Sequence, residues 1–113
     1  MDCLFCKIAA GEIPSQKVYE DEHVYAFRDI DPQAPVHVII IPKEHIESAN
    51  AITDENCAVI GHVFAAAAKI AKAEGIDEKG YRIVNNCGED GGQTVMHLHF
   101  HMLGKRSLAW PPG

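Results

Sequence analysis

The chain has 113 residues, of which 47 % are hydrophobic, a length and composition that predict one globular domain over residues 1–113. Its formal net charge of −6 argues against a nucleic-acid partner, although backbone N–H groups and a few imidazoles can still bind a small anion. The N-terminus lacks the pattern of a signal peptide, and no apolar run reaches the ~20 residues that span a bilayer, so we expect a cytoplasmic protein without membrane contact.

The first half of the chain predicts a short helix followed by strands. Residues 3–10 favour a short helix, and residues 23–28 a strand. Two prolines and two aspartates in residues 29–35 predict a turn. Residues 36–41 are β-branched and nearly all apolar, which is typical of an interior strand, and only His37 interrupts them.

The second half predicts one long helix and two more strands. Thr53 is a candidate N-cap, because apolar residues recur after it at helical spacing up to Gly75. Residues 81–86 favour a strand, a glycine-rich loop follows, and a last strand is expected to end near Leu103. Strands outnumber helices, so the sequence predicts an α+β fold with one long helix.

Three histidines, His97, His99 and His101, alternate directly after the loop Gly88-Glu89-Asp90-Gly91-Gly92-Gln93-Thr94. Successive side chains of a strand point to opposite faces, so we expect the three imidazoles on one face. The residues between and beside them are apolar and are expected on the other face: Met96, Leu98, Phe100 and Met102. The imidazoles can act near pH 7 as base, acid, nucleophile or metal ligand.

Two chemistries compete for this row of histidines. Neighbours on one face of a strand lie ~6.6 Å apart, so three in a row cannot close on one ion at ~2 Å bonds. A pair could still bind zinc with help from another segment. The alternative is nucleophilic attack on phosphorus, with glycine N–H groups and the Thr94 hydroxyl at the phosphate. The combination of glycine loop, hydroxyl and histidine row favours this second chemistry.

The chain resembles the histidine triad (HIT) nucleotide-binding family, whose motif is His-φ-His-φ-His-φ-φ with φ apolar. Residues 97–103 match that motif at every position. Four further segments are similar to the branch of purine nucleoside phosphoramidases: Asp29-Ile30-Asp31-Pro32-Gln33-Ala34-Pro35, Ile41-Pro42-Lys43, Asp90-Gly91-Gly92-Gln93-Thr94 and Trp110-Pro111-Pro112-Gly113.

The resemblance implies a fold, a partner and a reaction. It implies a five-stranded, mostly antiparallel sheet, joined in a homodimer to a ten-stranded sheet. It also implies hydrolysis of purine nucleoside phosphoramidates or acyl-adenylates, which releases the nucleoside monophosphate. His99 would be the nucleophile that becomes nucleotidylated, His101 would bind the phosphate or leaving-group side, and His37 would complete a proton relay.

The same resemblance implies a nucleotide site. Asp29 would accept hydrogen bonds from the ribose hydroxyls, and the purine would lie against Phe5, Phe27 and Ile30. Residues from the loop after the 81–86 strand would surround the phosphate: Asn86, Gly92, Gln93 and Thr94. Trp110 would lie near the site of the other subunit.

Cys3 and Cys6 form a Cys-x-x-Cys pair, a spacing that suits one tetrahedral zinc ion when two ligands come from elsewhere. A thioredoxin-like redox pair is the alternative, but it requires a preceding strand. The resemblance to some bacterial members implies that His45 and His97 complete a structural zinc site. No organic cofactor is expected, and the competing class of function is a nucleotide-binding regulatory module with little catalysis.

Overall fold

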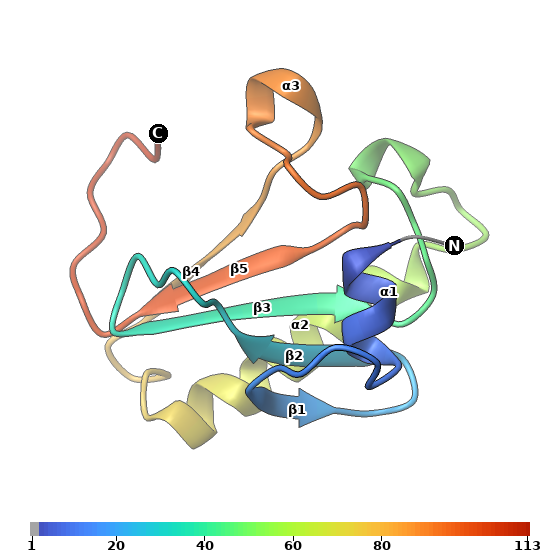
Figure 1. The fold of residues 1–113 in the computed structure, drawn as a ribbon. Coiled ribbons are helices and arrows are strands. Elements are labelled where there is room, and N and C mark those ends of the chain that lie inside the picture. Colours follow the sequence, from blue (N-terminus) through green and yellow to red (C-terminus); the bar gives the residue numbers. More distant parts are fainter. Residues whose placement is uncertain (1–2) are drawn as a thin grey trace.

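The computed structural model describes residues 3–113, and Figure 1 shows one sheet with α1 on one side and α2 on the other. Over this range five strands pair antiparallel in the order β1-β2-β3-β5-β4. The strands are β1 (Lys17–Glu20), β2 (Val24–Arg28), β3 (Val36–Pro42), β4 (Tyr81–Asn85) and β5 (Phe100–Gly104). The helices are α1 (Leu4–Ala9), a 3-10 turn η1 (Ala49–Ala51), α2 (Ala58–Glu74) and α3 (Gly88–Gly91). The α+β sheet with one long helix is therefore confirmed.

None of the helices within residues 3–113 is long and apolar enough to cross a membrane.

The hydrophobic core forms on both faces of β3, the interior strand between β2 and β5. Val38 and Ile40 pack with α2 on one face, and Ile39 and Ile41 pack with α1 on the other. Because strand side chains alternate, His37 lies on the α1 face, where it interrupts the apolar run.

The long helix α2 begins later than expected, so the predicted N-cap at Thr53 is wrong. The side chain of Asn56 accepts a hydrogen bond from the Thr53 N–H at 2.7 Å, and residues 54–57 form a turn. The helix therefore starts at Ala58, after Cys57. Its end agrees with the expectation, because Gly75 caps it in the left-handed conformation (φ 71°) that glycine adopts without strain.

Strand β5 begins at Phe100, so His97 and His99, which were expected on this strand, precede it. The Leu98 N–H donates to the carbonyl of Ile46 at 2.6 Å, and the Asn85 side chain donates to the carbonyl of His99 at 2.9 Å. These bonds occupy backbone groups that a regular ladder would use. The alternation of faces nevertheless persists, because Leu98 and Phe100 lie in the core beneath α2.

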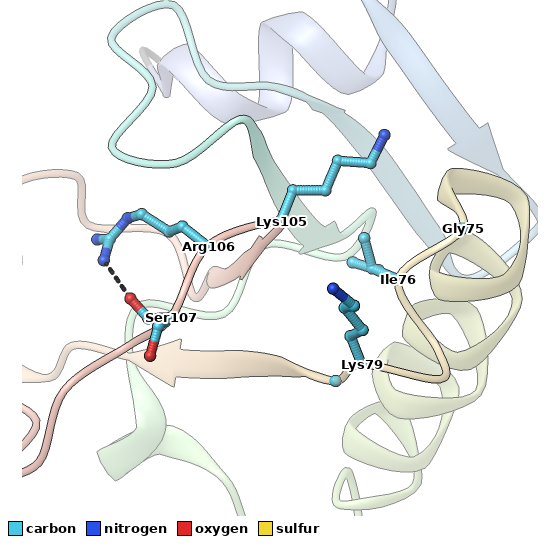
Figure 2. Close-up of a pocket in the computed structure, with 7 residues that line it drawn as sticks. Gly75, Ile76, Lys79, Lys105, Arg106 and Ser107 are labelled. Carbon is cyan, nitrogen blue, oxygen red and sulfur yellow. Dashed lines mark hydrogen bonds between the residues drawn. The ribbon is translucent and has the colours of Figure 1, made fainter.

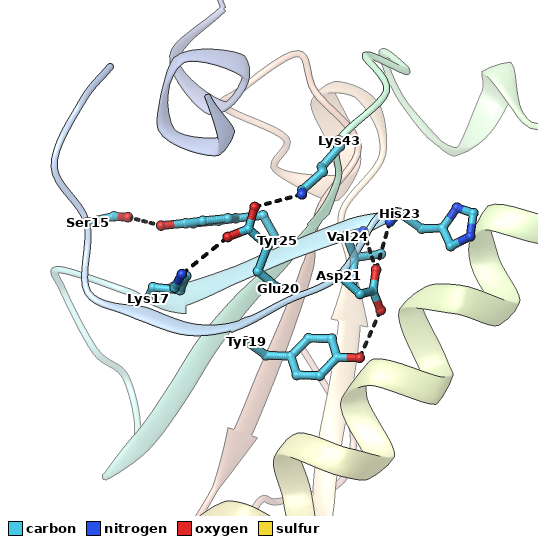
Figure 3. Close-up of polar contacts among 9 residues, drawn as sticks. All are labelled: Ser15, Lys17, Tyr19, Glu20, Asp21, His23, Val24, Tyr25 and Lys43. Carbon is cyan, nitrogen blue, oxygen red and sulfur yellow. Dashed lines mark hydrogen bonds and ion pairs between the residues drawn. The ribbon is translucent and has the colours of Figure 1, made fainter. Parts of the chain in front are cut away.

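The hairpin between β1 and β2 is fixed by polar contacts, which Figure 3 shows. The carboxylate of Asp21 accepts hydrogen bonds from the His23 N–H at 2.8 Å and from the Tyr19 hydroxyl at 2.8 Å. Glu20 forms an ion pair with Lys43 at 2.7 Å, which ties β1 to the end of β3. These bonds hold β1 as a strand of its own at the edge of the sheet.

Candidate functional site

The side chain of His99 is held so that one particular nitrogen is available. Its Nδ1 lies 2.7 Å from the carbonyl oxygen of His97, and a carbonyl can only accept, so Nδ1 carries the proton and donates. The other nitrogen, Nε2, therefore has a lone pair. His99 is 4 % exposed, and the ring of Phe5 packs edge-on against it with ring centroids 5.0 Å apart. This is the tautomer that a nucleophilic imidazole needs.

A chain of hydrogen bonds also sets the tautomers of His37 and His101. The N–H of Gln33 donates to Nδ1 of His37 at 3.0 Å, so the proton of His37 is on Nε2. That Nε2 lies 2.8 Å from Nδ1 of His101 and 3.4 Å from a carboxylate oxygen of Asp29. His101 therefore accepts at Nδ1 and presents an Nε2–H donor.

Burial favours the neutral forms of His37 and His101. It lowers the pKa of His37 and of His101 below the usual value for imidazole, and His99 and His37 lower the pKa of His101 further. The Asp29 carboxylate opposes the shift and raises the pKa of both. Neutral imidazoles are the forms that the hydrogen-bond chain requires, so the electrostatics and the geometry agree.

Cys3, Cys6, His45 and His97 converge from three segments of the chain on the α1 side of the sheet, with their candidate ligand atoms all within 4.8 Å of one another. Nδ1 of His97 lies 3.3 Å from the Cys3 sulfur and 3.5 Å from the Cys6 sulfur, and Nδ1 of His45 lies 3.4 Å from the Cys6 sulfur. Tetrahedral zinc places sulfur and nitrogen ligands about 3.5 Å apart, from Zn–S bonds of ~2.3 Å and Zn–N bonds of ~2.0–2.1 Å.

The orientation of His97 also suits a metal ligand. Its Nε2 donates to the carbonyl of Pro42 at 2.8 Å, which leaves the Nδ1 lone pair directed at the two sulfurs. His97 is fully buried, so water cannot compete for that lone pair. These four residues, called here the cysteine–histidine group, fit zinc in donor type, spacing and tautomer.

The three histidines of the motif do not share one ion. His97 faces the cysteines, His99 bonds to a backbone carbonyl, and His101 bonds to His37. In the part of the chain that the structure describes, the other cluster with metal-ligand spacing is Asp29, His37 and His101. There, the Gln33 N–H fixes a proton on the His37 Nε2, so that nitrogen is a hydrogen-bond donor without a lone pair for a metal.

A pocket of about 550 Å³ lies beside these histidines and is lined by three of the residues expected at the base and ribose. It contains Phe27, Asp29 and Ile30, which the sequence singled out, and five further residues: Ile8, Pro14, Ser15, Gln16 and Arg28. Phe5 reaches the same region, because its ring packs edge-to-face on Phe27 at 5.6 Å. Sequence reasoning missed Ile8, although its position three residues after Phe5 on a helix is a usable signal.

The loop expected at the phosphate is held largely by Gln93. Its side-chain amide donates to the carbonyls of Glu47 and Val95 at 2.8 and 3.0 Å, and accepts from the Gly88 N–H at 3.1 Å. Gly92 caps α3 in the left-handed conformation (φ 79°). Gln93 therefore shapes the loop from within.

The remaining expected nucleotide residues lie in different surroundings. Thr94 lines a pocket of about 520 Å³ together with Cys3 and His45, next to the cysteine–histidine group. Asn86 directly follows β4 and is partly buried. Trp110 is 82 % exposed in the C-terminal segment, which Figure 1 shows on the opposite side of the molecule from α1.

A further pocket, of about 630 Å³, lies between the end of α2 and the segment after β5. Figure 2 shows that the side chains of Lys105 and Lys79 extend in different directions and that Arg106 turns toward Ser107. The guanidinium of Arg106 donates to the carbonyls of Gln33 and Ser107 at 2.9 and 3.0 Å. The cationic groups of this pocket therefore do not converge on one point.

Comparison with known proteins places this geometry in a family. The HIT domain matches residues 10–108. An uncharacterised HIT-like protein of Synechococcus elongatus is 54 % identical over 112 residues, which cover 99 % of this chain and 97 % of that protein. The purine nucleoside phosphoramidase of Escherichia coli K12 is 49 % identical over 107 residues, covering 95 % of this chain and 90 % of the enzyme.

Solved structures agree with the sequence comparison. A HIT family hydrolase from Legionella pneumophila has a TM-score of 0.97 and 52 % identity, covering 99 % of this chain and all of that one. A histidine triad protein from Clostridium difficile has a TM-score of 0.94 and 51 % identity, covering 96 % of this chain and 95 % of that one. With the triad motif and the antiparallel sheet already established, the chain belongs to the HIT domain family.

Proposed function

We propose that this protein hydrolyses purine nucleoside phosphoramidates or acyl-adenylates and releases the nucleoside monophosphate. The observation that carries the proposal is the 2.7 Å bond from Nδ1 of His99 to a backbone carbonyl, which leaves Nε2 as a nucleophile. The 49 % identity to a purine nucleoside phosphoramidase supports the substrate class. The ribose would bind Asp29, and the purine would lie against Phe5, Phe27 and Ile30.

For a phosphoramidate substrate, the reaction would proceed in two displacements at phosphorus. Nε2 of His99 forms a bond to phosphorus while the bond from phosphorus to the leaving nitrogen breaks. That nitrogen takes the Nε2 proton of His101, and water returns a proton to His101. The remaining hydroxide then attacks phosphorus, which breaks the bond to His99 and frees the nucleotide. His37 holds His101 in the tautomer that presents its Nε2–H.

The phosphate would be bound at the loop that follows β4. In this proposal Asn86, Gly92, Gln93 and Thr94 surround it, with Gln93 fixing the shape of the loop. Trp110 would act on the site of a second subunit, because it is exposed and the C-terminal segment that carries it lies on the opposite side of the molecule from α1. The functional form would then be a homodimer.

Zinc would be held by the cysteine–histidine group. The donor set and spacing of Cys3, Cys6, His45 and His97 support this assignment. Four protein ligands close the coordination sphere, so the ion would supply structural stability rather than an open position for water.

The substitution His99→Ala tests the proposed reaction. We expect kcat/KM for adenosine 5′-phosphoramidate to fall by more than about 10³-fold, because the attacking nitrogen is lost. His62→Ala is the matched control, since His62 lies on α2 and stacks on His23 away from the site. Turnover that persists in His99→Ala would exclude the covalent route.

A nucleotide-binding module with little catalysis is the competing function, and the same experiment separates the two. In that case the unmodified chain binds AMP but does not turn over the phosphoramidate. The binding pocket beside Phe27 is compatible with either, whereas the two ordered histidine tautomers favour the enzyme.

A further inference from the structure

His97 connects the cysteine–histidine group to His99. Through its ring it contacts both cysteine sulfurs, at 3.3 and 3.5 Å, and the carbonyl of Pro42 at 2.8 Å. Through its backbone carbonyl it accepts the Nδ1 proton of His99 at 2.7 Å. Any force that fixes the ring of His97 therefore also fixes the acceptor that selects the tautomer of His99.

Helix α1 provides a second connection between the same two places. Cys3 caps this helix and Cys6 lies in its first turn, so both sulfurs are fixed to α1. Phe5, between them, packs on His97 at 6.0 Å and on His99 at 5.0 Å, and also on Phe27 at 5.6 Å. The helix is only six residues long, and an isolated helix of that length is not stable in water.

The contacts that anchor α1 to the group are weak without a metal. A thiol is a poor hydrogen-bond donor, and the sulfur–nitrogen contacts here are 3.3–3.5 Å long. A tetrahedral ion replaces them with bonds that bridge α1 to both His45 and His97.

We propose that metal binding by the cysteine–histidine group orders His99 through the carbonyl of His97. Through Phe5, it also orders the apolar surface of Phe5 and Phe27 that would contact the purine. The group is thus a positioning element of the active site, and its cysteines and His45 act through other residues. The catalytic part of this inference rests on the proposed function of His99, whereas the structural part does not.

The test compares zinc-loaded protein, chelated protein and the variant Cys3→Ser/Cys6→Ser. Cys57→Ser is the matched control, because Cys57 is an exposed thiol outside the group. The measurements are zinc per chain, the ¹⁵N spectrum of the imidazoles, which reports the tautomer of His99, and the affinity for AMP by calorimetry. Zinc-loaded protein and Cys57→Ser should hold one zinc, with His99 protonated only at Nδ1.

In the zinc-free forms we expect mixed tautomers of His99 and AMP binding weakened by about tenfold, with both effects reversed when zinc is returned to the chelated protein. If zinc-free protein keeps a single His99 tautomer and its AMP affinity within about twofold, the proposal is wrong. It is equally wrong if the native chain binds no zinc. Should the double variant fail to fold, chelation and His45→Ala give the same comparison without changing α1.

Failure of this inference is distinguishable from failure of the proposed function. If zinc-loaded protein turns over no phosphoramidate or acyl-adenylate, while the tautomer of His99 and AMP affinity still follow zinc, only the proposed reaction fails. If turnover is normal and neither property follows zinc, only the present inference fails.

Discussion

Three backbone groups decide which nitrogen of each histidine is free. The carbonyl of His97 accepts a hydrogen bond from Nδ1–H of His99, and the carbonyl of Pro42 accepts one from Nε2–H of His97. The N–H of Gln33 donates to the Nδ1 lone pair of His37. Backbone groups carry no sequence signature, so the motif predicts that these histidines matter but not which atom of each one acts. The ring of His97 faces the cysteines, that of His99 bonds to a backbone carbonyl, and that of His101 bonds to His37. The roles that the resemblance implied for these three residues stay predictions.

At this scale, Asp29→Asn should move the acid limb of the pH profile to lower pH. The carboxylate raises the pKa of His37 and His101, so its removal lowers both, and the protonated forms break the hydrogen-bond chain. The measurements are kcat/KM against pH and an NMR titration of the two imidazoles. Asp54→Asn, in the turn before α2, is the control; a shift of the limb to higher pH would contradict the argument.

At the scale of elements, short segments outside the strands hold the site. The turn of residues 29–35 carries Asp29 and Gln33, and the Arg106 guanidinium anchors this turn by donating to the Gln33 carbonyl at 2.9 Å. The strands themselves follow the hydrophobic pattern closely, which is why β2, β3 and β4 lie near their predicted positions. The predicted starts of α2 and β5 are wrong because Asn56 and Asn85 form side-chain hydrogen bonds that the hydrophobic periodicity does not indicate.

Arg106→Gln should loosen the turn without unfolding the sheet. Loss of a hydrogen bond from a charged donor at an exposed position is expected to lower kcat/KM about two- to tenfold. Hydrogen exchange should show a faster-exchanging Gln33 amide, because that N–H is the donor to His37. Lys105→Gln removes a neighbouring positive charge and should leave the amide protected; equal effects of both changes would point to charge alone.

Gly104→Ala should destabilise the junction of β5 and α2. A Cβ at this position would lie 2.8 Å from Cδ1 and 3.3 Å from Cγ2 of the buried Ile76, so the core is overpacked by about 1–3 kcal/mol in the free energy of unfolding. Ile76→Val removes the Cδ1 atom and should recover part of that loss in the double variant. Urea unfolding measures all four proteins, and strictly additive effects would contradict a direct clash.

At the scale of the whole molecule, the sheet ends in an edge strand. Within residues 3–113, β4 pairs on one side with β5 and has no strand on the other, and each of its residues is partly exposed. An edge with unpaired N–H and C=O groups can accept a strand from a second copy. The same arrangement would carry Trp110 toward a second subunit.

We expect the purified chain to sediment as a dimer with twice the mass of one chain. Pairing of β4 with its copy would produce the ten-stranded sheet and satisfy the edge. Sedimentation velocity over a dilution series measures this directly. A single-chain mass at about 100 μM would contradict the dimer and leave Trp110 without its proposed role.

The sequence by itself determined the fold class, the interior strand with its histidine, the long helix and the residues of the triad motif. These are properties of local periodicity and of motif spacing, both of which are visible along the chain. Tertiary structure alone decided which nitrogen of His37, His97 and His99 is free, how Phe5 joins the cysteines to the pocket beside Phe27, and that Ile8 lines that pocket. These depend on hydrogen bonds and packing between segments up to 94 residues apart, such as Cys3 and His97, which no local pattern encodes.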